Sequence, residues 1–282
     1  MMKKLFYTIL AVVVMMMISL IALPCEAAQK VVAIMPIKNN VNTRYSSVAA
    51  KTMTDELINV FVNSGMYTVV ERGQLDQVIG EMGFSSTGMV DSNSVIEIGK
   101  LSGAQYILVG NVSMADVYQS VIPLTTIKTF RAKVGMIYRL IDAKTGKILL
   151  SSSVEDQHTI DEVTGSDFSE EVLLHKACSN VAEKILKEIQ KKNPVIGNIL
   201  DVNGEEVYID LGTDSGLRVG ETLMVFKEGA PIYGKNGEIV TTRIIELGEI
   251  KVTQVEEGYS IGKIKEKNNG IVKDALVKRV IK

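Results

Sequence analysis

The stretch Tyr67-Thr-Val-Val-Glu-Arg-Gly-Gln-Leu-Asp-Gln-Val-Ile79 joins a short apolar strand to a segment with helical spacing. The stretch Gly99-Lys-Leu-Ser-Gly-Ala-Gln-Tyr-Ile-Leu-Val-Gly110 pairs the two elements again, with the helical segment first and an apolar strand after it. Continuous apolar strands that alternate with helices are typical of a sheet covered by helices. These two stretches therefore predict the centre of an α/β or α+β body with a mixed β-sheet and flanking helices.

The segments on either side extend this pattern. An apolar run within 30–37 predicts another buried strand, and Ala49, Met53 and Leu57 mark a helix that Asn63-Ser64-Gly65 should end. Asp91-Ser-Asn-Ser94 is expected to cap a further helix. Together these segments predict alternating strands and helices over the first half of the chain.

From Thr126 the hydrophobic period changes to two. Phe130, Ala132, Val134, Met136, Tyr138 and Leu140 fall on one face of the expected strand. The turn 142–147 leads into a second strand over 148–154, which predicts an antiparallel hairpin. A capping box at Asp167 and Glu170 should open the next helix, whose core stripe includes Cys178 and predicts a buried, inert thiol.

The run Lys191-Lys-Asn-Pro194 marks a domain boundary. Beyond it the chain is rich in glycine turns and short alternating strands, which favours a small all-β domain, either a barrel or a sandwich. We expect three parts: a signal peptide over 1–28, an α/β domain over 29–192, and a small barrel-like domain over 193–282.

The first 28 residues have the pattern of an export signal. Lys3 and Lys4 precede an apolar run over 9–21, and Pro24 with the small residues Ala27 and Ala28 forms a cleavage site. The run is short for a spanning helix. The sequence predicts export with cleavage near Ala27 or Ala28, and retention of the segment as an anchor is the alternative.

Cys25 raises the alternative of a lipid-modified N-terminus. Lipidation motifs want small residues directly before the cysteine, and Leu23 and Pro24 occupy those positions. We therefore favour the unmodified export signal. Cleavage after it leaves Cys178 alone, so we expect no internal disulfide in the exported chain.

Composition excludes several function classes. A net charge of -2 is opposite to the basic face that nucleic-acid binding requires. The chain has two histidines, two cysteines and no phosphate-binding loop or nucleophile elbow, so we expect no metal, no cofactor and no enzymatic activity. His158, expected in a polar loop, and His175, expected off the core stripe of its helix, are not expected to share a metal ion.

With these residues in view, 30–190 resembles the curli production assembly/transport (CsgG) family. The matching features, in chain order, are the opening Val-Ala-Ile-Met-Pro strand, Tyr-Thr-Val-Val-Glu71-Arg72 with Leu75, Glu81 with Gly88, Ile98-Gly99-Lys100-Leu101-Ser-Gly103-Ala104, Leu-Val-Gly110, and Leu140-Ile-Asp142 with Thr145-Gly146. The module also resembles the N-terminal domain of TolB and the penicillin-binding-protein activator lipoproteins. The tail, Val202-Asn-Gly-Glu-Glu-Val-Tyr-Ile-Asp-Leu-Gly212 with Gly216-Leu-Arg-Val-Gly220, resembles the C-terminal domain of the flagellar T-ring protein FlgT.

The resemblance implies an exported assembly factor of the cell envelope that forms rings or contacts envelope partners. It also implies the alternative of an outer-membrane secretion channel for curli-like fibre proteins, built from two hairpins per subunit. A membrane-spanning strand needs about 9–11 residues with one apolar face. Pro123 interrupts the first candidate hairpin, over 113–127, and acidic residues crowd the second, over 155–167. The sequence therefore favours a periplasmic or peripherally attached scaffold over the channel.

Glu71 and Arg72 are the candidate contact residues. They form a charged pair between a buried strand and a helix, where a subunit or partner could bind. The alternative is a local role, in which Glu71 caps the helix and is favoured by its dipole.

Overall fold

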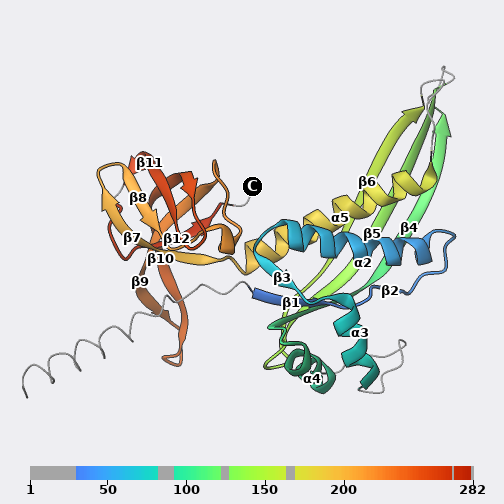
Figure 1. Cartoon of the computed structure of the whole chain (residues 1–282), viewed down its shortest axis with the longest axis horizontal. Coiled ribbons are helices and arrows are strands. Elements are labelled where there is room, and N and C mark those ends of the chain that lie inside the picture. Colours follow the sequence, from blue (N-terminus) through green and yellow to red (C-terminus); the bar gives the residue numbers. More distant parts are fainter. Residues whose placement is uncertain (1–29, 82–91, 122–126, 163–168, 269, 281–282) are drawn as a thin grey trace, which may run out of the picture.

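The computed structural model describes residues 30–81, 92–121, 127–162, 169–268 and 270–280. The predicted signal peptide, Cys25, Pro123 and Asp167 lie outside these residues. The first part of the chain forms a mixed sheet with helices on both faces, and the second part forms a closed barrel (Figure 1). This confirms the predicted fold class.

The elements of the first part follow the predicted alternation, except for the short strand β2, where the sequence favoured a loop. They are β1 (Lys30–Ile34), β2 (Lys38–Asn39), α2 (Ser46–Asn63), β3 (Tyr67–Val69), α3 (Arg72–Glu81), α4 (Ser92–Ser102), β4 (Tyr106–Val121), β5 (Lys128–Asp142), β6 (Ile148–Glu162) and α5 (Glu170–Lys192). The sheet order is β3-β1-β4-β5-β6, with β2 beside β4. Strand β1 is parallel to β3 and β4, and β2 is parallel to β4, whereas β4 pairs with β5, and β5 with β6, in antiparallel fashion.

Two separate cores cover the two faces of this sheet. Val32, Ile34 and Leu108 pack with the apolar stripes of α2 and α5. The alternate residues Ala33 and Ile107 pack with α3 and α4 on the opposite face. Because consecutive strand residues point to opposite faces, a run such as Val-Val-Ala-Ile contributes to both cores.

Strands β4, β5 and β6 continue beyond the helices as a three-stranded extension (Figure 1). The length of this extension was not predicted. We expected the strand that begins at Tyr106 to end at Val109 and the strand that begins at Ile148 to end at Val154. A bulge between Val112 and Met114 shifts the phase of β4, so the buried residues Val112 and Ala115 are three apart and the period of two is lost.

The start of α5 differs in detail from the expected capping box. The N-cap is Ser169, whose side chain accepts a hydrogen bond from the backbone N–H of Val172 at 3.5 Å. Glu170 lies in the first turn and accepts a hydrogen bond from the Tyr45 hydroxyl at 2.7 Å. The helix therefore begins two residues after the start that a cap at Asp167 would give, with Ser169 in the capping role.

The barrel is antiparallel, with strand order β10-β11-β8-β7-β12-β9. Its strands are β7 (Ile196–Asn203), β8 (Glu206–Ile209), β9 (Thr222–Tyr233), β10 (Ile239–Val255), β11 (Ser260–Asn268) and β12 (Leu276–Arg279), and η1 (Thr213–Ser215) is a short 3-10 helix. Its core, which includes Ile199, Val225 and Ile250, is separate from the two cores of the sheet. None of the described helices is long and apolar enough to cross a membrane.

Cys178 lies on the buried side of α5, as predicted, and is fully inaccessible. Burial, reinforced by the nearby charge of Glu56, raises the pKa of the Cys178 thiol to about 12. Since the thiolate is the reactive form, Cys178 should react with a disulfide reagent at pH 8 at least about 100-fold more slowly in the native protein than in urea. The measurement uses the chain without residues 1–28.

A Lys100→Cys variant provides the control for this prediction, because Lys100 is exposed on α4. It should show one fast thiol and one slow thiol in the native state. Two fast thiols in the native variant would show that Cys178 is accessible and that the packing of α5 described above is wrong.

Candidate functional site: the cleft between the α/β body and the barrel

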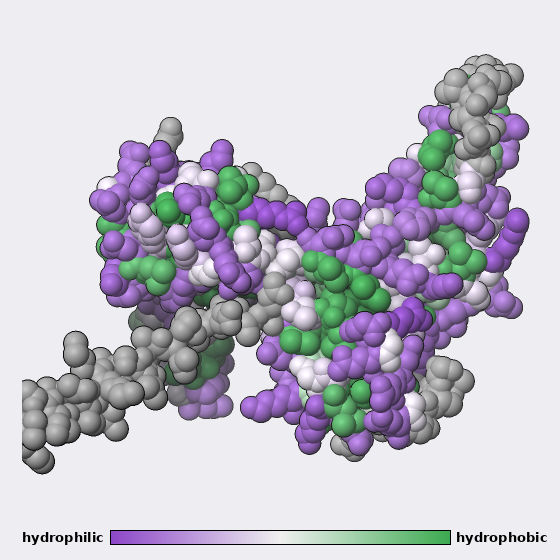
Figure 2. Space-filling view, viewed as in Figure 1, coloured by the Kyte–Doolittle hydropathy of each residue, from purple (hydrophilic) through white to green (hydrophobic). Residues whose placement is uncertain are grey.

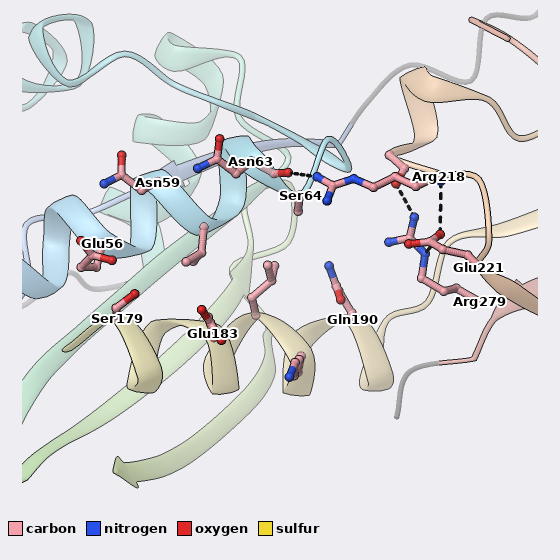
Figure 3. A pocket seen from close by; sticks show the side chains of 14 residues that line it. Glu56, Asn59, Asn63, Ser64, Ser179, Glu183, Gln190, Arg218, Glu221 and Arg279 are labelled. Atoms are coloured by element: carbon pink, nitrogen blue, oxygen red, sulfur yellow. Dashed lines mark hydrogen bonds and ion pairs between the residues drawn. The ribbon is translucent and has the colours of Figure 1, made fainter. Parts of the chain in front are cut away.

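A cleft of about 680 Å³ lies where the C-terminal halves of α2 and α5 meet the barrel (Figure 3). Its lining is mainly polar and comes from α2 and its C-cap, from α5, from the loop before β9, and from the end of β12. The residues are Glu56, Asn59, Val60, Asn63, Ser64, Ser179, Glu183, Leu186, Lys187, Gln190, Gly216, Arg218, Glu221 and Arg279. Ligand sites are commonly clefts of about 300–1,000 Å³ between domains, so this is the candidate functional site of the described chain.

One end of the cleft is closed by contact between the barrel and the C-terminus of α2. The last turn of α2 contains no basic residue. Arg218 of the barrel supplies the missing cation and donates a hydrogen bond to the backbone carbonyl oxygen of Asn63 (Figure 3). A cation at this position satisfies an unpaired helix carbonyl and is favoured by the helix dipole.

Arg279, at the end of β12, is the centre of the contact between the two parts. Its Nε lies 2.9 Å from Glu221 Oε2, and its Nη2 donates to the carbonyl oxygen of Gly216. Its Nη1 lies 3.0 Å from the sulfur of Met66, which follows α2. The Arg279 side chain is 16% exposed, and burial lowers its pKa while the charge of Glu221 opposes that change.

Gly65 and Gly216 bring the two backbones together at the same place. Both residues have positive φ values, 70° and 68°, which favour glycine. A Cβ on Gly216 would lie 2.5 Å from the carbonyl oxygen of Ser64 and 2.6 Å from Met66 Cγ. Only residues without a side chain allow this approach, so the barrel sits directly on the turn that ends α2.

The floor of the cleft carries charges of both signs. Glu56 is buried, and its Oε1 lies 3.0 Å from Nε2 of His175 on α5. Glu183 and Lys187 are exposed one turn apart on α5, and neither forms an ion pair among the described residues. These two unpaired charges can bind a partner that presents the opposite signs.

The side chains that line the cleft determine what it can do chemically. Its lining contains no cysteine or histidine, and no described cluster of three or more carboxylate, histidine or cysteine side chains could hold a metal ion. Its polar side chains instead suit binding through hydrogen bonds and charge pairing.

Glu71 and Arg72 lie away from this cleft, at the start of α3. Glu71 caps α3, because its Oε2 accepts a hydrogen bond from the backbone N–H of Gln74 at 3.0 Å. Hydrogen bonds from the backbone N–H groups of Gly73 and Gln74 lower the pKa of Glu71. Arg72 instead reaches Asp55 of α2 at 3.5 Å and Asp76 at 3.9 Å.

Glu71 and Arg72 therefore have the local roles that were the alternative interpretation. Both side chains are exposed, and their role in binding a partner stays a prediction.

The two histidines lie on different elements, His158 on β6 and His175 on α5. The expected polar loop at His158 was wrong: His158 lies within β6, opposite Ala132 of β5, because β6 continues to Glu162. His175 lies off the core stripe of α5, as predicted, and is largely exposed.

Sequence reasoning missed the cleft. Arg218 was quoted only within the tail that resembles FlgT, and Arg279 was not singled out. The one available signal was the absence of a basic residue from the end of α2, which predicts that a cation is supplied from elsewhere in the chain.

The model of the family described as "Curli production assembly/transport component CsgG" matches residues 13–187. This match includes the described elements from β1 to β6 and most of α5. The chain belongs to the CsgG family. The barrel lies outside the match, so its expected likeness to FlgT stays a prediction.

Several solved structures share part of the fold of this CsgG-family protein. The C-terminal domain of LpoB from Salmonella enterica is 23% identical, with 48% of this chain and 87% of that chain covered and a TM-score of 0.33. Lipoprotein GNA1162 from Neisseria meningitidis is 16% identical; the match covers 56% of this chain and 98% of that chain, with a TM-score of 0.37. A PelC dodecamer from Paraburkholderia phytofirmans is 17% identical; the match covers 56% of this chain and 85% of that chain, with a TM-score of 0.32.

At these TM-scores the similarities bear on neither function nor assembly. A search of curated proteins finds no match.

Proposed function

We propose that this CsgG-family protein is a non-enzymatic, exported scaffold of cell-envelope assembly or secretion, which acts by self-association or by binding envelope partners. The observation that carries the proposal is membership of the CsgG family over residues 13–187. The export-type leader agrees with a periplasmic location. The proposal also includes peripheral association with the outer membrane.

The proposal includes a division of labour. Residues 29–192 act as the family domain and residues 193–282 as an adaptor, which the resemblance of the tail to the C-terminal domain of FlgT supports. The separate cores of the sheet and the barrel agree with this division. The contact at Arg218, Arg279 and Gly216 fixes the adaptor to the family domain, so that a partner bound to one part is positioned by the other.

A secretion channel for curli-like fibre proteins is the second candidate, and strand length favours it. Strands β4, β5 and β6 have 16, 15 and 15 residues, more than the about 9–11 that a membrane crossing needs. The charge on their faces opposes it. Five charged residues follow the side of the extension turned away from α5, namely Asp116, Arg131, Lys133, Glu155 and Asp161.

The other side of the extension is charged as well. Asp156 lies there and pairs with Lys184 of α5 at 3.1 Å. Because a lipid-facing strand requires one apolar face, the charges on both sides favour the scaffold.

Fractionation tests the proposal. The full-length protein should be found in the periplasmic or peripheral envelope fraction without detergent. The purified chain without residues 1–28 should either exceed monomer mass in light scattering or retain an envelope protein in a pull-down. Recovery only in detergent, together with conductance in planar bilayers, would establish the channel instead. A strictly monomeric protein without any envelope partner would contradict both.

A further inference from the structure

A β-hairpin extends from the barrel beyond the strands that surround it. It consists of residues 227–246 of β9 and β10, because β12 pairs with β9 only to Phe226 and β11 pairs with β10 only from Gly248. In Figure 1 it points away from α2 and α5. A two-stranded hairpin without a covering layer is only marginally stable in water.

The strands of this hairpin expose several large apolar side chains. Six large hydrophobic side chains are between 44% and 64% exposed: Ile232, Tyr233, Ile239, Val240, Ile244 and Ile245. Exposed apolar clusters of this kind mark interaction surfaces. The hairpin is therefore a candidate interaction surface.

The end of the hairpin is polar and determines which occupant fits. The turn Gly234-Lys-Asn-Gly-Glu238 carries one charge of each sign, and its Lys235 forms no ion pair among the described residues. Figure 2 shows this end as hydrophilic, beyond a hydrophobic band. Insertion of the hairpin into lipid would bury the charged Lys235 and Glu238 before the apolar side chains, which is unfavourable. The hairpin therefore fits a protein cleft that is lined by charged groups.

The cleft between the body and the barrel has the complementary charges. Its floor presents Glu183 and Lys187 one helical turn apart, both exposed and unpaired in the described chain. The hairpin turn presents Lys235 and Glu238 three positions apart. Apolar side chains also line the cleft, namely Val60 of α2 and Leu186 of α5, and they can contact the hydrophobic band of the hairpin.

We propose that the hairpin of one copy binds in the cleft of a second copy, with Lys235 toward Glu183 and Glu238 toward Lys187. The hairpin cannot reach the cleft of its own chain, because it is continuous with the barrel and points away from α2 and α5 (Figure 1). The contact is head-to-tail and therefore builds a ring if it closes and a filament if it does not. This inference rests on the self-association part of the proposed function and assigns the surface that performs it.

Charge exchange tests the contact. Lys235→Glu should weaken self-association of the chain without residues 1–28 at least about 10-fold in sedimentation velocity, because two like charges then meet. Glu183→Lys should have the same effect. An equimolar mixture of the two variants should regain association, since the altered hairpin again faces an opposite charge. Glu97→Lys and Lys100→Glu on α4 are the matched controls and should associate like the wild type.

Cysteine cross-linking provides a second readout that does not depend on charge. Asn236→Cys in the hairpin turn mixed with Asn59→Cys in the cleft should give a disulfide-linked heterodimer on oxidation, whereas Asn236→Cys mixed with Lys100→Cys should not. All three positions are exposed, and the native Cys178 is buried.

The outcomes separate this inference from the proposed function. Self-association that persists in both charge variants, without the specific cross-link, overturns the hairpin contact and leaves the scaffold proposal intact. Binding to vesicles of anionic lipid that Val240→Asp abolishes also overturns it, because the occupant is then a membrane. A strictly monomeric protein overturns it as well, and such a monomer that also binds no envelope partner overturns the scaffold proposal.

Discussion

Gly216→Ala is expected to lower the free energy of unfolding by about 3–4 kcal/mol, the sum of a left-handed backbone penalty and an overpacked contact. The φ value of Gly216 is 68°, and the new Cβ would lie 2.5 Å from the carbonyl oxygen of Ser64 and 2.7 Å from the carbonyl carbon of Gly65. Because these atoms belong to backbone, the strain cannot be relieved by a side-chain rotation. Urea unfolding monitored by circular dichroism measures the change.

Gly204→Ala is the matched control. Gly204 has a φ value of 63°, but a Cβ there would meet nothing within 4 Å. It should therefore cost only the backbone penalty, about 1–2 kcal/mol. Equal losses in the two variants would show that the close approach between α2 and the barrel does not exist in solution.

Arg279→Met should destabilise the protein by about 2–3 kcal/mol, slightly less than a fully buried ion pair costs to break. The side chains of Arg279 and Glu221 are 16% and 28% exposed, so solvent screens part of their interaction. The variant removes the guanidinium from Glu221, whose carboxylate keeps only the backbone N–H of Arg218 at 3.4 Å, and it leaves the Gly216 carbonyl oxygen without the Arg279 donor. Urea unfolding again provides the measurement.

A double-mutant cycle shows whether the cost arises from the unpaired acid. Arg279→Met with Glu221→Gln should lose less stability than the two single variants together, because the charge left behind is gone. Additive losses would mean that Arg279 acts through packing alone and that the ion pair contributes nothing to the contact.

The sequence predicts best where local chemistry decides the structure. The alternation from Phe130 to Leu140 correctly placed five buried side chains and the partly buried Phe130 on the core face of β5. Gly65 ends α2, as predicted, because a left-handed residue is needed there. In each of these segments, neighbouring residues determine the backbone.

Prediction failed where distant parts of the chain interact. The bulge near Ser113 hid the second half of β4, and β6 is polar because only one neighbouring strand and one side of α5 cover it. Gly216 was quoted only within the tail that resembles FlgT. Its position reflects a contact with Gly65, from which it is separated by about half of the chain, and no local pattern reports such a contact.

The contacts at Gly216, Arg218 and Arg279 hold the barrel in one position on the CsgG-family domain. Spin labels at Lys51→Cys on α2 and Lys263→Cys on β11 test this position by pulsed electron–electron double resonance, since both sites are exposed and Cys178 is buried. The structure predicts one narrow distance distribution, which Gly216→Ala broadens. A broad distribution in the otherwise unaltered protein would contradict the claim.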